Sequence, residues 1–122
     1  VEGTALDFRT PRTIGARMDV KPTGYDNNYV LDQVEGPTVR VSDPTTGRTI
    51  EMTTTEPGVQ LYTAFFLEET AGKGGAIYNQ FGGFCLEAQH YPDSIHHPAF
   101  PSTVLRPGQT YAQRTSYRFG VT

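Results

Sequence analysis

The sequence predicts an all-β protein built as an antiparallel β-sandwich. Turn-forming residues are frequent, with 13 glycines and 9 prolines among 122 residues, and they divide the chain into short segments. Seven tyrosines and seven phenylalanines favour strands. Apolar residues alternate with polar ones in several segments and nowhere recur convincingly at helical spacing. The length suits one hydrophobic core, so residues 1–122 are expected to form a single domain.

Residues 38–55 are expected to form a β-hairpin. Val39 and Val41 alternate with polar neighbours, and the same alternation returns at Ile50. Between these two runs, the sequence Asp-Pro-Thr-Thr-Gly at 43–47 supplies residues that favour a tight turn. Two antiparallel strands joined by this turn are therefore predicted.

Another strand is expected after Glu56, Pro57 and Gly58, where Glu56 is interpreted as a turn residue. One face of this strand would carry Val59, Leu61, Thr63, Phe65 and Leu67. Gln60 would lie on the opposite face together with further aromatic residues. Both faces are therefore partly apolar, as in the interior of a sandwich.

Two more strands are expected at 84–89 and 110–121. In the first, Glu87 and Gln89 lie on the face opposite Leu86, so a carboxylate stands beside an amide. In the second, aromatic residues recur on one face, which is typical of a strand that pairs within a sheet.

Charge and cysteine content exclude several classes of protein. The net charge of −3 has no basic block behind it, so no nucleic-acid partner is expected. Cys85 is the single cysteine, which rules out an intrachain disulfide and weakly favours the cytoplasm. No apolar run approaches the ~18 residues of a membrane span, so no membrane is expected either. The chain starts with neither an initiator methionine nor a signal peptide, which suggests a piece of a longer protein.

Three stretches together resemble the C-terminal part of the aldose 1-epimerase (galactose mutarotase) family. They are Gly-Tyr-Asp-Asn-Asn-Tyr-Val-Leu at 24–31, Thr-Thr-Glu-Pro-Gly-Val-Gln-Leu-Tyr-Thr at 54–63 and Phe-Cys-Leu-Glu-Ala-Gln-His-Tyr-Pro-Asp at 84–93. Their order and spacing also match, and weaker matches at 4–9 and 101–111 extend the resemblance over the chain. The resemblance implies the galactose mutarotase-like supersandwich fold and an isomerase of hexose metabolism. Such an enzyme interconverts the α and β anomers of aldohexoses such as galactose or glucose, without a metal or organic cofactor.

By this resemblance, Glu87 is the catalytic base that removes the proton of the anomeric hydroxyl, while Asp26 and Gln60 bind sugar hydroxyls. A carboxylate near a sugar hydroxyl can take its proton as the ring opens, provided that an acid protonates the ring oxygen. Carboxylate and amide groups suit polyols because they accept or donate hydrogen bonds in defined directions. The family's acid histidine, second substrate-binding histidine and binding arginine come from the part of the chain that precedes this one. The expected partners are therefore an aldohexose and either that preceding part or a second copy of the chain.

Each assignment has a structural alternative. Glu87 could be an ordinary exposed strand carboxylate, Asp26 an Asx-turn residue, and Gln60 an amide that satisfies backbone groups. His90, His96 and His97 are interpreted as structural or rim residues, because they lack metal-ligand spacing. Cys85 is interpreted as a small sheet residue. For the whole chain, the alternatives to an enzyme are a non-catalytic carbohydrate-binding module and a structural remnant without the acid. By the resemblance, the residues that distinguish one aldose from another lie partly in the preceding part of the family's chain.

Overall fold

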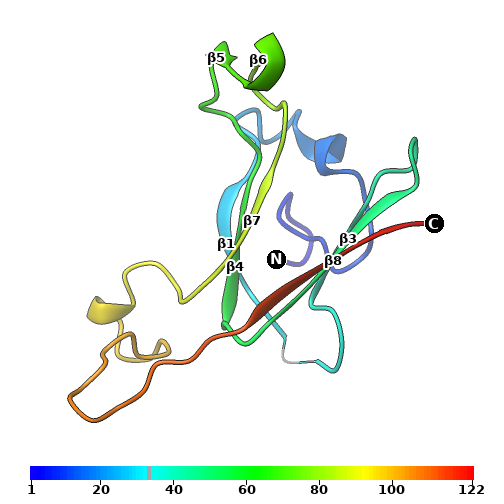
Figure 1. Cartoon of the computed structure of the whole chain (residues 1–122). Helices are drawn as coiled ribbons and strands as arrows, with labels where there is room; N and C mark the ends of the chain where they lie inside the picture. The colour runs from blue at the N-terminus through cyan, green and yellow to red at the C-terminus, as the bar shows by residue number, and fades with distance from the viewer. Residues whose placement is uncertain (33) are drawn as a thin grey trace. The chain divides into compact units, whose positions relative to one another are not determined.

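The computed structural model describes residues 1–32 and 34–122 and contains strands and short 3₁₀ turns, with no α-helix among these residues (Figure 1). The all-β prediction is therefore confirmed. The strands are β1 (Asp26–Val30), β2 (Val39–Ser42), β3 (Arg48–Thr54), β4 (Gly58–Tyr62), β5 (Thr70–Ala71), β6 (Ile77–Tyr78), β7 (Cys85–Gln89) and β8 (Thr115–Val121). The 3₁₀ turns are η1 (Ile14–Arg17), η2 (Lys73–Gly75) and η3 (Ser94–His96). In the described part of the chain, no helix has the length and apolar character that a membrane span requires.

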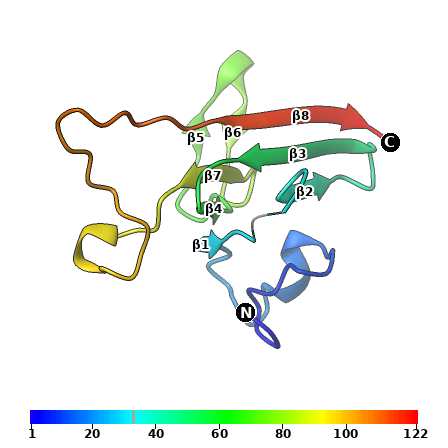
Figure 2. The same cartoon turned by 90° about the horizontal axis from the view of Figure 1, so that it is seen from below.

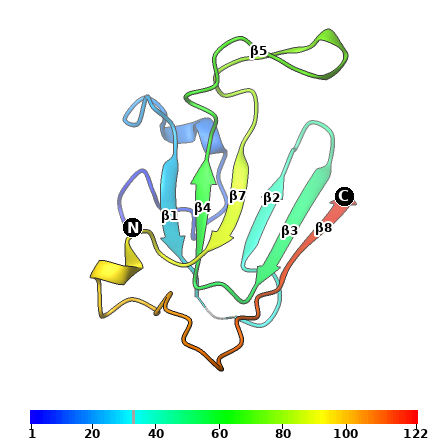
Figure 3. The same ribbon diagram turned by 60° about the vertical axis from the view of Figure 1, so that its left-hand side comes forward.

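The strands form two three-stranded sheets and one small hairpin. One sheet has the order β1-β4-β7 and the other has the order β2-β3-β8, while β5 pairs with β6 (Figure 3). The antiparallel alignment of β1 and β4 is framed by two backbone hydrogen bonds, from Thr63 N to Tyr25 O and from Leu31 N to Pro57 O, both 2.9 Å long. β3 runs antiparallel to β2 on one side and to β8 on the other (Figure 2). This antiparallel pairing confirms the predicted architecture.

By its contacts the chain divides into two compact units, which are residues 1–27 with 61–86 and residues 28–60 with 87–122. The division passes through β1, β4 and β7, so both units take part in the same strands. That residues 1–122 act as a single domain stays a prediction.

Tyr25 is the centre of the first unit's core and is 1% exposed. Its ring packs edge-on against Phe8 with ring centroids 5.1 Å apart, and its hydroxyl donates to the carbonyl of Ala5 at 3.1 Å. Its amide donates to Thr63 Oγ1 at 2.8 Å. Gly24 is required beside it, because its φ is +61° and a Cβ there would lie 2.3 Å from Thr63 Oγ1.

The predicted hairpin at 38–55 is confirmed in the second unit as β2 and β3. Val39 lies opposite Met52, which is 0% exposed, and the alternation then brings Val41 opposite Ile50. Backbone bonds from Asp43 N to Arg48 O and from Gly47 N to Asp43 O, each 2.8 Å, close the turn. The turn-forming residues and the alternation of apolar residues therefore both specify the hairpin that the structure shows.

The Asp43 carboxylate caps this turn and provides a testable pH effect. It accepts hydrogen bonds from Thr46 Oγ1 at 2.5 Å and from Thr45 N at 2.9 Å, and these bonds lower the pKa of Asp43 below its ordinary value. A lowered folded-state pKa stabilises the hairpin above the unfolded-state pKa, and this stability is lost as the pH falls through the folded pKa. We expect Thr46→Val to raise the pKa of Asp43, as measured by NMR titration of its carboxyl carbon. An unchanged pKa in this variant would contradict the assigned cause.

Two strands are shorter than the alternation predicts. β4 ends at Tyr62 rather than continuing to Leu67, because Ala64 adopts a left-handed conformation with φ +56° and the chain turns there. The amide of Leu67 then bonds to the carbonyl of Ala64 at 3.3 Å. β8 starts at Thr115 rather than at Thr110.

Candidate active site

The structure places the three predicted site residues in different settings. Glu87 is exposed in β7, Gln60 is half-buried in β4, and both belong to the unit formed by residues 28–60 and 87–122. Asp26 is the exposed first residue of β1, directly after buried Tyr25, and belongs to the other unit. The described geometry of the site is therefore that of Gln60 and Glu87.

Gln60 and Glu87 lie on the same side of the sheet β1-β4-β7. Side chains alternate between the two faces of a strand, so Gln60 faces the same side as position 58, and Glu87 the same side as Gln89. A Cβ built at Gly58 would lie 2.8 Å from Asn28 Oδ1, so the Asn28 side chain covers that side of β4. Gln89 Nε2 donates to the same oxygen at 3.2 Å, which places Gln89 and hence Glu87 on that side as well.

The opposite side of β4 is apolar in this unit, because Val59 is 4% exposed. In this unit β4 therefore has one buried apolar side and one side with polar residues, as is common in antiparallel sheets. The polar face carries a carboxylate and three amides, which are groups that can accept or donate hydrogen bonds in defined directions.

A buried carboxylate, Glu56, lies between β3 and β4 and is 3% exposed. Its Oε2 contacts His90 Nδ1 at 2.6 Å, and its Oε1 accepts a hydrogen bond from the Tyr111 hydroxyl at 2.8 Å. An ionised carboxylate only accepts hydrogen bonds, so His90 donates from Nδ1 in this pairing. Glu56 does lie in the predicted bend, but it also ties the end of β7 to the segment before β8, a role that sequence reasoning missed.

Tyr111 responds electrostatically to Glu56. The hydrogen bond to Glu56 is the main cause that raises the pKa of the Tyr111 hydroxyl, and partial desolvation and the negative charge of Glu56 act in the same direction. A raised folded-state pKa favours folding below the unfolded-state pKa, and this contribution is lost as the pH rises through the folded pKa. The contribution of Tyr111 to folding is therefore lost in alkaline solution.

Two histidines of the loop after β7 contact one aspartate. His96 and His97 lie on an exposed turn and both face Asp93, with His97 Nε2 3.4 Å from its carboxylate. Across residues 1–32 and 34–122, no group of three or more histidine, cysteine or acidic side chains is arranged to hold a metal ion. Cys85 is exposed in β7, at the edge strand of its sheet.

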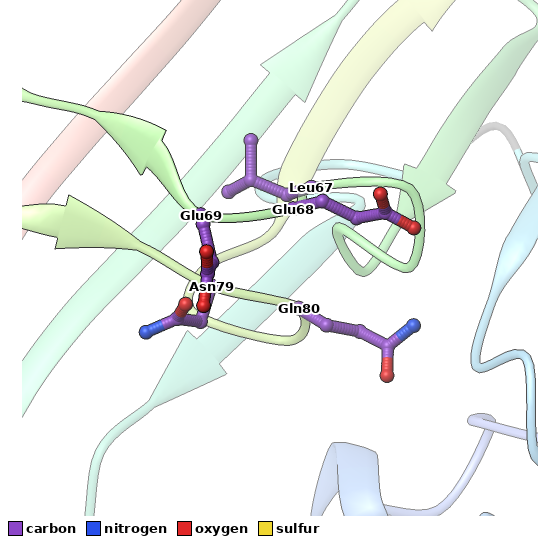
Figure 4. A pocket seen from close by; sticks show the side chains of 5 residues that line it. All are labelled: Leu67, Glu68, Glu69, Asn79 and Gln80. Carbon is purple, nitrogen blue, oxygen red and sulfur yellow. The ribbon is translucent and has the colours of Figure 1, made fainter.

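An open hollow in the first unit is lined by Leu67, Glu68, Glu69, Asn79 and Gln80 (Figure 4). The side chains do not converge, because Glu68 and Gln80 point away from Glu69 and Asn79. None of the predicted site residues lines it. Leu67 is the one apolar residue among those that line this hollow, and its polar side chains do not point toward one another. The hollow therefore lacks the apolar lining and the convergent polar groups of a binding site.

Comparisons with known proteins agree with the sequence resemblance. The family model described as aldose 1-epimerase matches residues 1–118. Galactose mutarotases of Mus musculus and Homo sapiens are 43% and 42% identical to this chain over 125 positions, which cover 99% of the chain but 36% of their own length. The crystal structure of a GalM/aldose epimerase homologue from C. elegans superposes with a TM-score of 0.90 at 27% identity, covering 99% of this chain and 38% of that one. The chain thus spans little more than a third of the length of these relatives. It belongs to the aldose 1-epimerase family.

Proposed function

We propose that this chain is the base-bearing part of an aldose 1-epimerase that interconverts the α and β anomers of an aldohexose. The observation that carries the proposal is the polar face of β1-β4-β7, on which Glu87 and Gln60 lie together in a chain of this family. In this proposal 1–122 acts as one domain of a larger fold. The single thiol, Cys85, favours a reducing compartment such as the cytoplasm.

The chemistry requires a base and an acid on one sugar. Glu87 takes the proton of the anomeric hydroxyl, and an acid from outside this chain protonates the ring oxygen as the C1–O ring bond breaks. The open aldehyde then closes on either face, with both protons returned, so that the two anomers exchange. Gln60 and Asp26 hold sugar hydroxyls during these steps, which keeps the reacting atoms near the two catalytic groups.

The missing acid is proposed to come from the preceding part of the same protein rather than from a second copy. The sheet β2-β3-β8 supports this choice, since its apolar face runs from buried Met52 to Phe119, which is 73% exposed, and Val121, which is 76% exposed. Apolar surface that continues a buried core is typical of a contact surface. The share of the relatives that this chain covers, 36%, leaves room for such a covering part.

If the preceding part of the protein covers the apolar face of the sheet β2-β3-β8, Val121→Thr should weaken the association of the two parts. The change keeps shape and β-branching but would bury a hydroxyl, at a cost of about 1–2 kcal/mol. We expect residues 1–122 carrying the change to bind the separately produced preceding part of mouse galactose mutarotase about 5- to 30-fold more weakly than the unchanged chain does. Isothermal titration calorimetry measures both affinities, and equal affinities would show that the preceding part does not cover Val121.

The function itself is tested on the completed protein, defined as residues 1–122 joined behind the part of mouse galactose mutarotase that this chain does not match. Magnetisation-transfer NMR is expected to show faster exchange between the anomers of galactose or glucose with this protein than in buffer. Chemical-shift changes on adding sugar without faster exchange would instead indicate a carbohydrate-binding module. A well-folded sample that shows neither would indicate a structural remnant.

A further inference from the structure

Two amide side chains meet above β4, the middle strand of the sheet β1-β4-β7. Gln89 Nε2 in β7 donates a hydrogen bond to Asn28 Oδ1 in β1 at 3.2 Å. Neighbouring strands lie about 4.8 Å apart, so the two outer strands are about 9.6 Å apart. Side chains from outer strands can meet at this distance only if the residue between them is small.

Gly58 in β4 provides this space. A Cβ at this position would lie 2.8 Å from Asn28 Oδ1, 3.0 Å from Asn28 Nδ2 and 3.1 Å from Tyr91 Cδ1. Gly58 is not among the glycines with positive φ, so its backbone conformation is open to other residues. Glycine at this position therefore leaves the space in which the Asn28 side chain meets Gln89.

The position of the Glu87 carboxylate is set by the backbone of β7. Within the part of the chain that the structure describes, no hydrogen bond or ion pair holds its exposed carboxylate. Gln89 lies two residues further along the same strand and on the same side, and its side chain is anchored across the sheet to Asn28. Any tilt or slip of β7 against β4 would move Glu87 relative to Gln60.

We propose that the Asn28–Gln89 bridge positions the base for the reaction, a role that rests on the proposed function. By joining β1 and β7 over Gly58, it fixes the distance of β7 from β4 and hence the placement of Glu87 relative to Gln60 on the same side of the sheet. Displacement of a reacting group by about 1 Å can lower the rate by about 100-fold. Gln89 and Asn28 are thus positioning residues that act through Glu87.

The test replaces Gln89 by leucine in the completed protein, which removes the amide with little change in side-chain length. We expect kcat for anomeric exchange to fall about 10- to 100-fold while KM changes less than about threefold, because a displaced base weakens only the transition state. The matched control is Gln113→Leu, since Gln113 is an exposed amide that accepts one hydrogen bond, from Thr115 Oγ1 at 3.2 Å. Its kinetic constants are expected to stay unchanged.

Two more variants separate positioning from simple stabilisation. Gly58→Ala keeps both amides but pushes them apart, so it is expected to reproduce the loss in kcat. Asn28→Ala combined with Gln89→Leu is expected to be no slower than the slower of the two single variants, because both changes remove the same bridge.

Two outcomes would overturn the inference while leaving the proposed function intact. In one, Gln89→Leu lowers the melting temperature but keeps kcat, which would show a purely structural amide. In another, KM rises with kcat unchanged, which would show that Gln89 binds the sugar directly. If the completed protein without substitutions fails to exchange anomers, the proposed function is wrong and the positioning role falls with it.

Discussion

Replacing Glu87 by glutamine in the completed protein is expected to lower kcat for anomeric exchange by about 10²- to 10⁴-fold, with a much smaller change in KM. Glutamine has the same shape and can still accept hydrogen bonds from a sugar, but it cannot take a proton at neutral pH. The acid from the preceding part would remain in place, so the loss isolates the base. Magnetisation-transfer NMR at several sugar concentrations gives both constants.

A matched control for this experiment is Glu35→Gln, which neutralises an exposed glutamate of the same unit in the loop before β2. It changes the net charge by the same amount as Glu87→Gln. We expect it to leave kcat within about twofold of the unchanged protein, since exposed charges far from a site have small effects. If both variants exchange anomers at the unchanged rate, Glu87 is not the base.

Replacing Glu56 by alanine is expected to lower the free energy of unfolding of the completed protein by about 2–4 kcal/mol. The change removes a carboxylate that is 3% exposed and leaves His90 Nδ1 and the Tyr111 hydroxyl without their acceptor. It also opens a cavity beside the bend that precedes β4. Urea denaturation followed by circular dichroism measures the change.

Glu56→Gln serves as the control for this prediction, because it keeps the side-chain volume and one acceptor oxygen. That oxygen can serve either His90 or Tyr111, while the amide nitrogen can only donate, so about half of the destabilisation is expected to remain. If Glu56→Ala unfolds within about 0.5 kcal/mol of the unchanged protein, the buried carboxylate does not hold these segments together.

The parts of the fold that sequence reasoning predicted are those set by neighbouring residues. The hairpin of β2 and β3 follows from alternation around a turn closed by Asp43, and the common face of Glu87 and Gln89 follows from the period of a strand. The end of β4 was not predicted, because alternation continues past Tyr62. The strand ends where Ala64 adopts a left-handed backbone conformation, and an alanine, unlike a glycine, does not indicate such a conformation in the sequence.

The parts of the site that were missed depend on contacts between distant residues. Glu56 meets His90 34 positions away and Tyr111 55 positions away, and Asn28 meets Gln89 61 positions away. Neither turn chemistry nor periodicity reports such contacts. One available signal was Gly58, which directly precedes an expected strand and is the first residue of β4 in the structure, because a glycine in a strand often marks a close approach of other groups.

The most direct test of this account compares the rate of anomeric exchange of α-galactose with residues 1–122 alone and with the completed protein. Residues 1–122 alone are expected to leave the rate at its value in buffer, because Glu87 lacks an acid partner. The completed protein is expected to raise the rate and to lose this gain when Glu87 is replaced by glutamine. Exchange by residues 1–122 alone at the rate of the completed protein would contradict the account.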